Sequence, residues 1–435
     1  MSEEKDNADC LKKAEQLVKD LYDFRDNYFN THGLNSGTTK EEDVQDRMNE
    51  VIAQLEEMKD ECEKKDRSQY FLYLGKALNV QSEYDERGFQ ALSKAVKLNP
   101  SLFEGLNQLG ESYWKKGQID LAIECFENTL KQEPKNVVAL RSLSMLFRQR
   151  TGDDQKEKLD SILKSHQKAK EALDADINDG MNWYILGNSL FYLYFLSPRQ
   201  DETRFKQCKF AYMKAANDKK ASQQPDFLYN YAHVLEYELN FKQALDCLDK
   251  ASLYDPSWSD PRERRESIRD YIKNVSTMIS NKASLKNRRI TKLVEDLKQD
   301  ILKRPVALKE LEVKTISNLG CGMNQNCCIM GKVIGQISSE GLLTSCFCIL
   351  DHESEVVAVN IINFNKEKEP LLYQTVTIIS PELHRETLEF QSHPTHSFVL
   401  SMIRVENPAS LLVNGRPLGS DAVLRPKVDF SLRTD

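Results

Sequence analysis

The sequence predicts a multidomain α + β chain in which an α-helical solenoid of repeated helix pairs is followed by a C-terminal β domain. A segment with small and aromatic residues at matching positions recurs between residues 69 and 281, as in solenoids built from one repeated unit. After Pro305 the helical spacing of apolar residues gives way to alternation, which indicates strands. The chain has 435 residues, which is enough for two or three domains.

Four segments follow from these patterns. They are N-terminal capping helices at 1–68, a repeat solenoid with its own capping helix at 69–281, a basic joint at 282–306 and a β domain at 307–435. Amphipathic helical patterns at 10–29 and 41–65 can start the stack, and residues 261–282 can close it as one long helix. Such caps are expected because the end units of a solenoid would otherwise leave an apolar face open.

The repeated unit is visible when five stretches are stacked. One small-residue position is shared by FLYLGKAL, LNQLGESYW, LRSLSMLFR, WYILGNSLF and LYNYAHVLE, where it holds Gly75, Gly110, Ser144, Gly187 and Ala232. The spacings are 35, 34, 43 and 45 residues, so the long ones equal a 34-residue period plus about 9 and 11 residues. The excess falls on the polar stretches TGDDQKEKLD and LSPRQDETRF, which predict loop insertions.

Each unit has the residues that a pair of packed helices needs. Gly110 allows a neighbouring helix to approach closely, Gly117 permits a turn, and Pro134 ends the unit. This arrangement resembles the tetratricopeptide repeat family. The resemblance implies a concave face lined by the second, fifth, ninth and twelfth positions of each unit's first helix.

Those concave positions combine aromatic side chains with charges of both signs. They are Asn107, Trp114, Arg141, Arg148, Tyr184, Asn188, Phe191, Asp226, Tyr229, His233 and Asp260. We expect a groove for a short extended peptide, bound by Arg148, Asp226, Asp260, Asn188, Tyr184, Arg141 and Tyr229. Asp226 and Asp260 favour a basic side chain, and Arg148 favours a carboxylate. The alternative for each charge is an ion pair with a neighbouring repeat.

The last third of the chain predicts a small barrel. Strand patterns occur at CIMGKVIGQI, TSCFCILD, EVVAVNII, QTVTIIS, LEFQ, HSFVLSMIRVE and SLLVNG, with a hairpin around DHESE. This number of strands suits an oligonucleotide/oligosaccharide-binding (OB) fold, with a β-sandwich as the alternative. From residue 320 onward 9 basic and 13 acidic residues give a net charge of -4, which disfavours nucleic acid as the barrel's own ligand. A protein contact or a scaffold role is expected instead.

The joint between the two parts has the opposite charge. From Lys282 to Arg304 there are eight basic and three acidic residues, a net of +5. Such a cluster suits a solvated linker helix, a local site for RNA phosphates or a nuclear-import signal.

Bulk composition and motifs exclude several function classes. With 60 basic and 67 acidic residues the net charge is -7, so no chain-wide attraction to nucleic acid or anionic lipid is expected. The apolar runs are short of the roughly 20 residues that span a bilayer and the start is acidic, so we expect a soluble, unsecreted protein. Ten cysteines without a CxxC pair predict reduced thiols, with no metal site, disulfide or cofactor, and Cys346 and Cys348 as buried strand residues.

No catalytic motif is present either. The chain lacks a Walker A loop, a GxSxG elbow, an HExxH pair and a kinase-like set. Its seven histidines, His233 and His384 among them, have no recognisable triad or metal partners and are expected at the surface or in the core. The prediction is a protein that is not an enzyme.

The order of repeats, basic joint and barrel, with LYDFRDNYF, GKALNV, LSKAVKL, NQLGESYWKKG, SLSMLFRQ, WYILGNS and LLVNGRP, resembles one branch of the tetratricopeptide repeat family. The resemblance implies an adaptor that recognises the Met-Arg-Glu opening of nascent α- and β-tubulin at the ribosome and triggers decay of tubulin mRNA. It also implies a second role, as a nuclear cofactor of a histone acetyltransferase coactivator in stress-responsive and DNA-damage transcription. Cytoplasm and nucleus are the compartments that these roles imply.

The resemblance also assigns residues. It matches the peptide contacts to Arg148, Asp226 and, with Glu replaced by the shorter Asp, Asp260. It matches ribosome contacts to Lys286 and, with Lys replaced by Arg, to Arg288, and Arg289 beside them is included in the predicted contact with ribosomal RNA. Lys94 and Lys97, three apart on a helix, are candidates for docking a downstream mRNA-decay adaptor, or else they form an ordinary solvated face.

Overall fold

A computed structural model describes most of the chain. The described residues are 9–33, 39–150, 155–196, 202–338, 344–389 and 397–423. They form two compact units: one contains the chain up to Asn230 together with Lys250–Trp258, and the other contains Tyr231–Asp249 and the chain from Ser259. Among the described residues, no helix is long and apolar enough to cross a membrane.

The first unit begins with the predicted N-terminal helices. They are α2 (Asp9–Asp26), α3 (Tyr28–His32), α4 (Lys40–Glu57) and α5 (Lys59–Lys65). Their buried faces share a core with the first repeat helix, in which Val18, Leu21 and Val51 are almost fully buried. Helices therefore occupy both segments for which the sequence predicts amphipathic helices.

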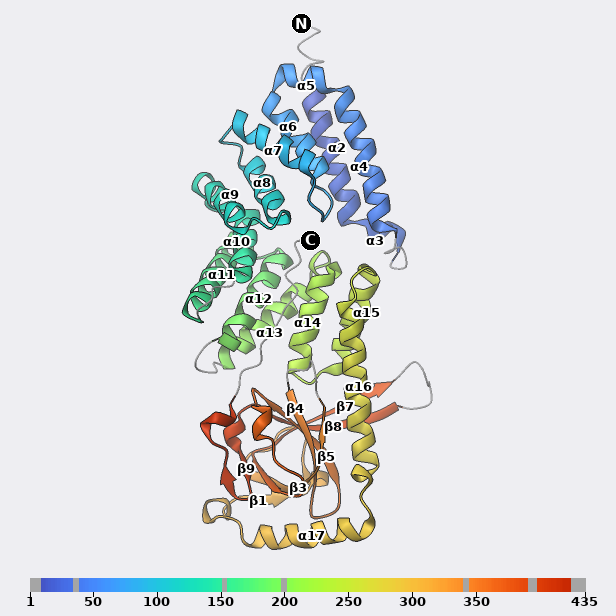
Figure 1. The fold of residues 1–435 in the computed structure, drawn as a ribbon, viewed down its shortest axis with the longest axis vertical. Helices are drawn as coiled ribbons and strands as arrows, with labels where there is room; N and C mark the ends of the chain where they lie inside the picture. Colours follow the sequence, from blue (N-terminus) through green and yellow to red (C-terminus); the bar gives the residue numbers. More distant parts are fainter. Residues whose placement is uncertain are drawn as a thin grey trace. The chain divides into compact units, whose positions relative to one another are not determined.

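Helix pairs then follow one another along the chain (Figure 1). The pairs are α6 (Arg67–Leu78) with α7 (Glu86–Leu98), α8 (Phe103–Lys115) with α9 (Ile119–Gln132), α10 (Val137–Gln149) with α11 (Gln155–Ala175), α12 (Gly180–Leu196) with α13 (Glu202–Ala216), and α14 (Pro225–Tyr237) with α15 (Phe241–Tyr254). A short 3-10 turn, η2 (Ala221–Gln223), precedes α14. The predicted solenoid of repeated helix pairs is confirmed.

The shared small-residue position packs against the second helix of its own unit. A Cβ atom added at Gly75 would lie 2.6 Å from Leu92 Cγ, and one at Gly110 would lie 3.0 Å from the ring of Phe126. Separations of this size leave no room for a larger side chain, which explains the glycine. Gly117 has a φ of +78° in the turn after α8, a conformation that favours glycine.

The two predicted loop insertions are wrong in part. Helix α11 begins at Gln155 and is 21 residues long, so the second half of TGDDQKEKLD is helical. Likewise α12 extends to Leu196 and α13 begins at Glu202, so the end of LSPRQDETRF is helical. The polar, charged residues of these stretches are typical of loops, but such residues are also good helix formers on an exposed face. Residues 151–154 and 197–201 lie outside the described residues.

The second unit contains two further helices and a β sheet. Helix α16 (Asp260–Ser280) is the predicted long closing helix, and α17 (Asn287–Leu302) falls in the basic joint. The strands are β1 (Glu312–Lys314), β2 (Gly322–Met323), β3 (Cys327–Ile337), β4 (Thr344–Leu350), β5 (Val356–Ile362), β6 (Thr375–Ile379), β7 (Glu382–Glu389), β8 (Ser397–Val405), β9 (Leu411–Val413) and β10 (Arg416–Pro417). The domain boundaries expected from the sequence stay a prediction.

All described strands belong to one sheet. Its order is β10-β9-β6-β3-β4-β5-β8-β7-β2, and β1 pairs in parallel with β3. One curved sheet is the arrangement of an OB fold, whereas the alternative sandwich needs two. The strand predicted at residues 388–391 begins earlier, at Glu382, and residues 390 and 391 lie outside the described residues.

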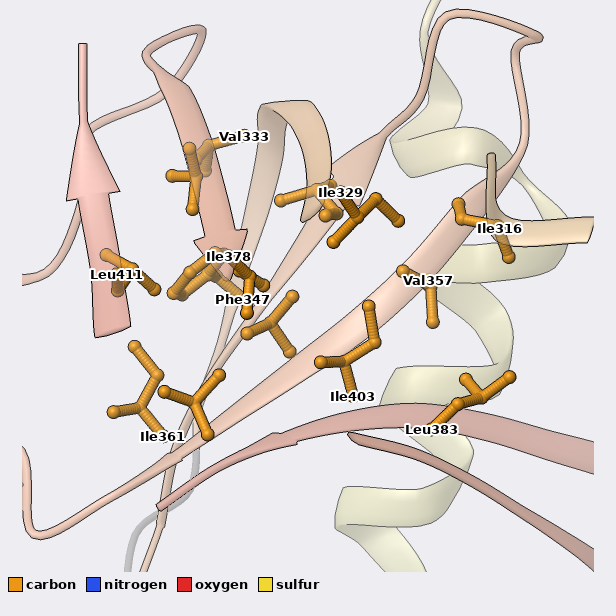
Figure 2. Packing of buried hydrophobic residues seen from close by; sticks show 14 of the residues in the cluster. Ile316, Ile329, Val333, Phe347, Val357, Ile361, Ile378, Leu383, Ile403 and Leu411 are labelled. Atoms are coloured by element: carbon orange, nitrogen blue, oxygen red, sulfur yellow. The ribbon is translucent and has the colours of Figure 1, made fainter. Parts of the chain in front are cut away.

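The sheet encloses an apolar core on one face and meets α16 on the other. Figure 2 shows Val333, Phe347 and Val357 among the core residues, all fully buried. Helix α16 packs against β3, β4 and β5, and its Tyr271 donates a hydrogen bond to Asn360 of β5. Because both faces of β4 are covered, every residue of the strand is buried, the predicted Cys346 and Cys348 included.

Candidate peptide-binding groove and basic helix

Arg148 is the most unusual charged residue of the first unit. It lies in the last turn of α10 and is only 6% exposed. Within the described part of the chain, its Nε and Nη1 atoms have no hydrogen-bond partner. The guanidinium carbon lies 5.9 Å from the ring centre of Tyr192. Buried donors without acceptors are costly, so this side chain is suited to an acceptor that a ligand would bring.

Tyr184, on the first helix of the next repeat, is hydrogen-bonded to an acidic residue. The Tyr184 hydroxyl of α12 donates to Asp226 Oδ2 of α14 at 2.6 Å, and Asn230 Nδ2 donates to the same hydroxyl at 2.8 Å. Burial raises the pKa of Tyr184 well above its usual value, and the Asp226 carboxylate raises it further while Arg148 acts in the opposite direction. The phenol therefore remains a neutral donor, with a carboxylate and a guanidinium both close enough to influence it.

Packed aromatic rings hold this tyrosine in place. The Tyr212 hydroxyl donates to Asn188 Oδ1, and Tyr212 lies 6.1 Å from Tyr184 between ring centres. The ring of Phe227 lies 5.3 Å from Tyr184 in an edge-on contact. A side chain fixed by both packing and hydrogen bonds loses little further freedom on binding.

Three residues of this network were not among those predicted. Asn230 follows Asp226 by one helical turn, so helix spacing could have identified it. Tyr212 lies on a second helix, and Phe227 lies beside Asp226 but outside the concave positions. Their pairing with Tyr184 depends on how α12, α13 and α14 pack, which the sequence pattern does not specify.

Three predicted groove residues have contacts or positions that differ from those of the network around Tyr184. The Arg141 Nη1 atom lies 2.8 Å from Asp179 Oδ2 in an ion pair, the alternative that the sequence left open. The ring of Tyr229 lies 4.7 Å from that of Trp258. Asp260 is exposed at the first residue of α16 and belongs to the other unit. The peptide-binding roles of these three residues stay predictions.

The predicted ribosome-binding residues lie at the start of α17. Lys286 precedes the helix and Arg288 is in its first turn, and both are exposed. The Arg289 guanidinium lies 4.1 Å above the ring centre of Tyr373, so it is held against the β domain. The opposite face of the helix buries Leu293 and Leu297. An amphipathic helix thus fixes two cations on the surface of the second unit.

The two predicted docking lysines differ from each other. Lys94 and Lys97 are both on α7, but the Lys94 ammonium lies 3.8 Å above the ring centre of Phe71. Lys97 is exposed in the last turn of the helix. A cation held on an aromatic ring is a less mobile contact than a solvated one.

Metal binding has no obvious place in this arrangement. Among the described residues, no group of three or more His, Cys, Asp or Glu side chains is placed to hold a metal ion. What the described side chains offer is a buried cation on α10, a hydrogen-bonded carboxylate on α14 and tightly packed aromatic rings, which together suit a peptide with charges of both signs.

Matches to family models define the class of protein. Residues 103–136 match the tetratricopeptide repeat model, and residues 310–427 match the model described as the tetratricopeptide repeat protein 5 OB fold domain. The predicted fold class, a tetratricopeptide-repeat solenoid followed by an OB fold, is therefore confirmed. A chain built from these two domains is an adaptor or protein-binding protein, of a kind that is typically not enzymatic.

Whole-chain relatives then give the family. The chain is 34% identical to human (Homo sapiens) tetratricopeptide repeat protein 5 over 436 residues, covering 97% of this chain and 96% of that one. It is 33% identical to the bovine (Bos taurus) protein of the same name, with the same coverage. Among solved structures, a tetratricopeptide repeat protein of Thermus thermophilus matches at 19% identity over 46% of this chain and 98% of that chain, with a TM-score of 0.39. The chain belongs to the tetratricopeptide repeat protein 5 family.

Proposed function

We propose that this adaptor recognises the N-terminal Met-Arg-Glu peptide of nascent α- and β-tubulin at the ribosome and triggers co-translational decay of tubulin mRNA. The observation that carries the proposal is Arg148, a buried cation with two donor atoms that have no partner within the described chain. The proposal assigns the peptide's Glu carboxylate to these donors, in the geometry that guanidinium groups favour. The protein acts by binding alone.

The peptide's Arg is assigned to Asp226. The carboxylate of Asp226 already accepts a hydrogen bond from Tyr184 at 2.6 Å, and this bond orients it. In this proposal the peptide's arginine meets a carboxylate and the adjacent glutamate meets a guanidinium. Asp260 belongs to the other unit, and its contact with the same arginine stays a prediction from the sequence. Reversing the two peptide residues would place like charges together, which costs affinity.

Ribosome binding is assigned to Lys286, Arg288 and Arg289. The first two are exposed, and the third is fixed against Tyr373. In the proposal they contact ribosomal RNA phosphates while the groove holds the peptide. Two weak contacts to one ribosome reinforce each other because the second becomes effectively intramolecular.

To trigger mRNA decay, the protein must also bind a downstream partner. We assign Lys97, with Lys94 beside it, to docking of a downstream mRNA-decay adaptor, and the exposure of Lys97 supports this choice. The competing role is that of a nuclear cofactor for a histone acetyltransferase in stress-responsive transcription. It would use other surfaces and would not depend on Arg148.

The test is binding of a fluorescent peptide beginning Met-Arg-Glu, compared with the same peptide with Arg and Glu exchanged. Wild type is expected to prefer the first peptide. Arg148→Ala should weaken binding by about 2–4 kcal/mol, roughly thirtyfold to a thousandfold, because it removes one partner of a buried charge pair. Arg150→Ala is the matched control, since Arg150 is exposed just after α10 and its Nη2 atom lies 3.4 Å from Asp120 Oδ1, and it should bind nearly as wild type does.

Two results would reject the proposal. Equal binding of both peptides would show that the groove does not select the residue order. Undetectable binding of either peptide by the folded wild-type chain would leave the nuclear role as the better account.

A further inference from the structure

Four large apolar side chains gather on the surface of the α12–α13 pair. Phe210 and Met213 of α13 are 51% and 54% exposed, and Ile177, in the turn before α12, is 61% exposed. The half-buried ring of Trp183 lies 5.7 Å from that of Phe210 in an edge-on contact, and its Nε1 atom donates to the Ile177 carbonyl oxygen at 2.8 Å. These four residues are here named the α13 patch, and all belong to the first unit.

The patch is more than a scatter of exposed apolar residues. A single one, such as Leu121 of α9, is ordinary on a protein surface. Phe210 and Met213, in contrast, are three apart on one helix and therefore share a face, and Phe210 is in contact with Trp183. Apolar side chains that adjoin one another in this way mark an interaction surface.

The core of the repeat does not need these side chains. Helix α13 buries a separate stripe, consisting of Phe205, Cys208, Tyr212 and Ala215, each at most 4% exposed. Their spacing of three and four residues defines the face that packs into the first unit. The exposed apolar residues of α13 lie off that stripe, so the packing of the helix does not explain them.

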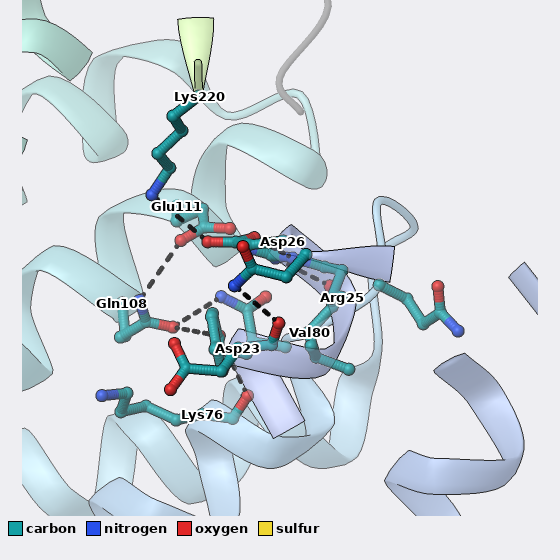
Figure 3. Close-up of polar contacts among 12 residues, drawn as sticks. Asp23, Arg25, Asp26, Lys76, Val80, Gln108, Glu111 and Lys220 are labelled. Atoms are coloured by element: carbon teal, nitrogen blue, oxygen red, sulfur yellow. Dashed lines mark hydrogen bonds and ion pairs between the residues drawn. The ribbon is translucent and has the colours of Figure 1, made fainter. Parts of the chain in front are cut away.

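Both ends of the surface are held in place. A Cβ atom added at Gly180, the first residue of α12, would overlap Asp218 just beyond α13. The Asp218 Oδ1 atom in turn accepts a hydrogen bond from the Ala221 N–H at 2.8 Å. Lys220 lies 3.3 Å from Asp26 of α2 between Nζ and Oδ2 (Figure 3). This lysine is engaged by α2, so the charge around the patch comes from lysines earlier in α13.

Those lysines surround the apolar residues with positive charge. From residue 203 to residue 217 there are four basic residues and no acidic one, a net of +4. Lys206 and Lys214 are exposed one turn before and one turn after Phe210, and Lys209 lies one turn before Met213. The Lys214 ammonium lies 5.3 Å from the ring centre of Phe210. A basic rim therefore borders the apolar centre, although the chain as a whole is acidic.

We propose that the α13 patch docks an amphipathic helix of a partner protein, whose apolar stripe covers Phe210 and Met213 and whose flanking Asp and Glu side chains meet Lys206 and Lys214. An apolar, aromatic centre with a charged rim is the usual composition of a protein interface, and a helix presents apolar residues at the matching spacing. RNA phosphates would contact the lysines but leave the apolar centre uncovered. This surface goes beyond the peptide and ribosome contacts proposed above and uses none of their residues.

The experiment measures binding of two fluorescent designed peptides to the full chain. Both are helical peptides of about five turns with leucines three and four residues apart. One has Glu at every position that flanks the leucines, and the other has Lys there. Wild type should bind the Glu peptide in preference to the Lys peptide, and added salt should weaken that binding because exposed charges are screened.

Variants at exposed positions locate the binding site. Phe210→Ser should weaken binding of the Glu peptide by about tenfold or more, the effect of truncating a central aromatic contact. Lys214→Glu should weaken it by about threefold to tenfold, because like charges then face each other. Leu121→Ser and Lys131→Glu make the same changes at exposed residues of α9 and should bind as wild type does. Arg148→Ala should also bind as wild type does, and circular dichroism should show that every variant is folded.

The outcomes decide between occupants. A loss confined to Phe210→Ser and Lys214→Glu would support the proposal. Equal binding of the two peptides, no binding of the Glu peptide, or a loss in Arg148→Ala without a loss in Phe210→Ser would overturn it, and the last result would place the peptide in the groove instead. Binding to phosphatidylserine vesicles or self-association in sedimentation, if abolished by Phe210→Ser while the Glu peptide does not bind, would assign the patch to a membrane or to a second copy and would also overturn it. In each of these cases the peptide function proposed above is tested separately by the Met-Arg-Glu peptide.

Discussion

Replacing Arg148 by methionine should stabilise the free protein while it removes peptide binding. Methionine keeps the apolar stem of the side chain but not the buried guanidinium, whose Nε and Nη1 atoms have no partner within the described chain. A buried unsatisfied donor costs about 1–3 kcal/mol, and the lost contact with Tyr192 offsets about 0.5–1 kcal/mol. The free energy of unfolding should therefore rise by about 1 kcal/mol in Arg148→Met, the middle of a range of roughly 0–2.5 kcal/mol.

Thermal unfolding of the full chain without peptide measures this change. The unfolding midpoint of the first unit should rise by roughly 2–4 °C, the shift that such a change produces in a domain of this size. Arg141→Met is the control, because it breaks the ion pair with Asp179 and should leave the midpoint unchanged or lower it. If Arg148→Met lowered the midpoint, Arg148 would stabilise the folded chain in the absence of a ligand. The argument that its guanidinium is suited to a ligand would then be wrong.

Three further predictions concern packing, pH and salt. Gly187→Ala should lower stability by about 1–3 kcal/mol in denaturant titration, because its Cβ would lie 2.8 Å from the ring of Tyr212; unchanged stability would contradict the close packing. Burial, with two nearby cations, lowers the pKa of His166 from 6.5 to about 4. The unfolded chain then binds a proton that the folded chain excludes, so stability should fall as the pH falls through this window. In His166→Gln the thermal midpoint should depend less on pH between 6.5 and 4; an identical profile would refute this. Replacing Lys286 and Arg288 by alanine should reduce the salt dependence of ribosome binding, by about one unit of log–log slope for each lost phosphate contact; an unchanged slope in co-sedimentation would show that they do not contact phosphates.

The fold was predictable from the sequence because its signals are local and repeated. The position shared by Gly75, Gly110 and Gly187 predicted helices in close contact, and the structure brings each glycine against the second helix of its own unit. The strands were equally clear, since turn residues separate short alternating runs. The two insertions differ from the prediction because polar residues suit both a loop and the exposed first turns of α11 and α13.

The candidate site was predictable only in part. Arg148, Tyr184 and Asp226 follow from the repeat positions, and the structure joins Tyr184 to Asp226 by a hydrogen bond. Tyr212 and the ion pair of Asp26 with Lys220 could not be found in this way because they depend on contacts between distant segments. The sequence places Asp26 and Lys220 far apart, and only the packing of the helices between them brings the two charges to 3.3 Å.

The most direct test of the central claim uses ribosomes that carry a nascent chain. Ribosomes stalled with the first residues of tubulin should retain the wild-type protein in co-sedimentation, whereas ribosomes whose nascent chain has Arg and Glu exchanged should not. Arg148→Ala alone and the Lys286→Ala/Arg288→Ala pair should each reduce retention strongly, because both contacts are needed for tight binding. Equal retention on the two kinds of ribosome, or retention that survives Arg148→Ala, would contradict the account of an adaptor that recognises nascent tubulin.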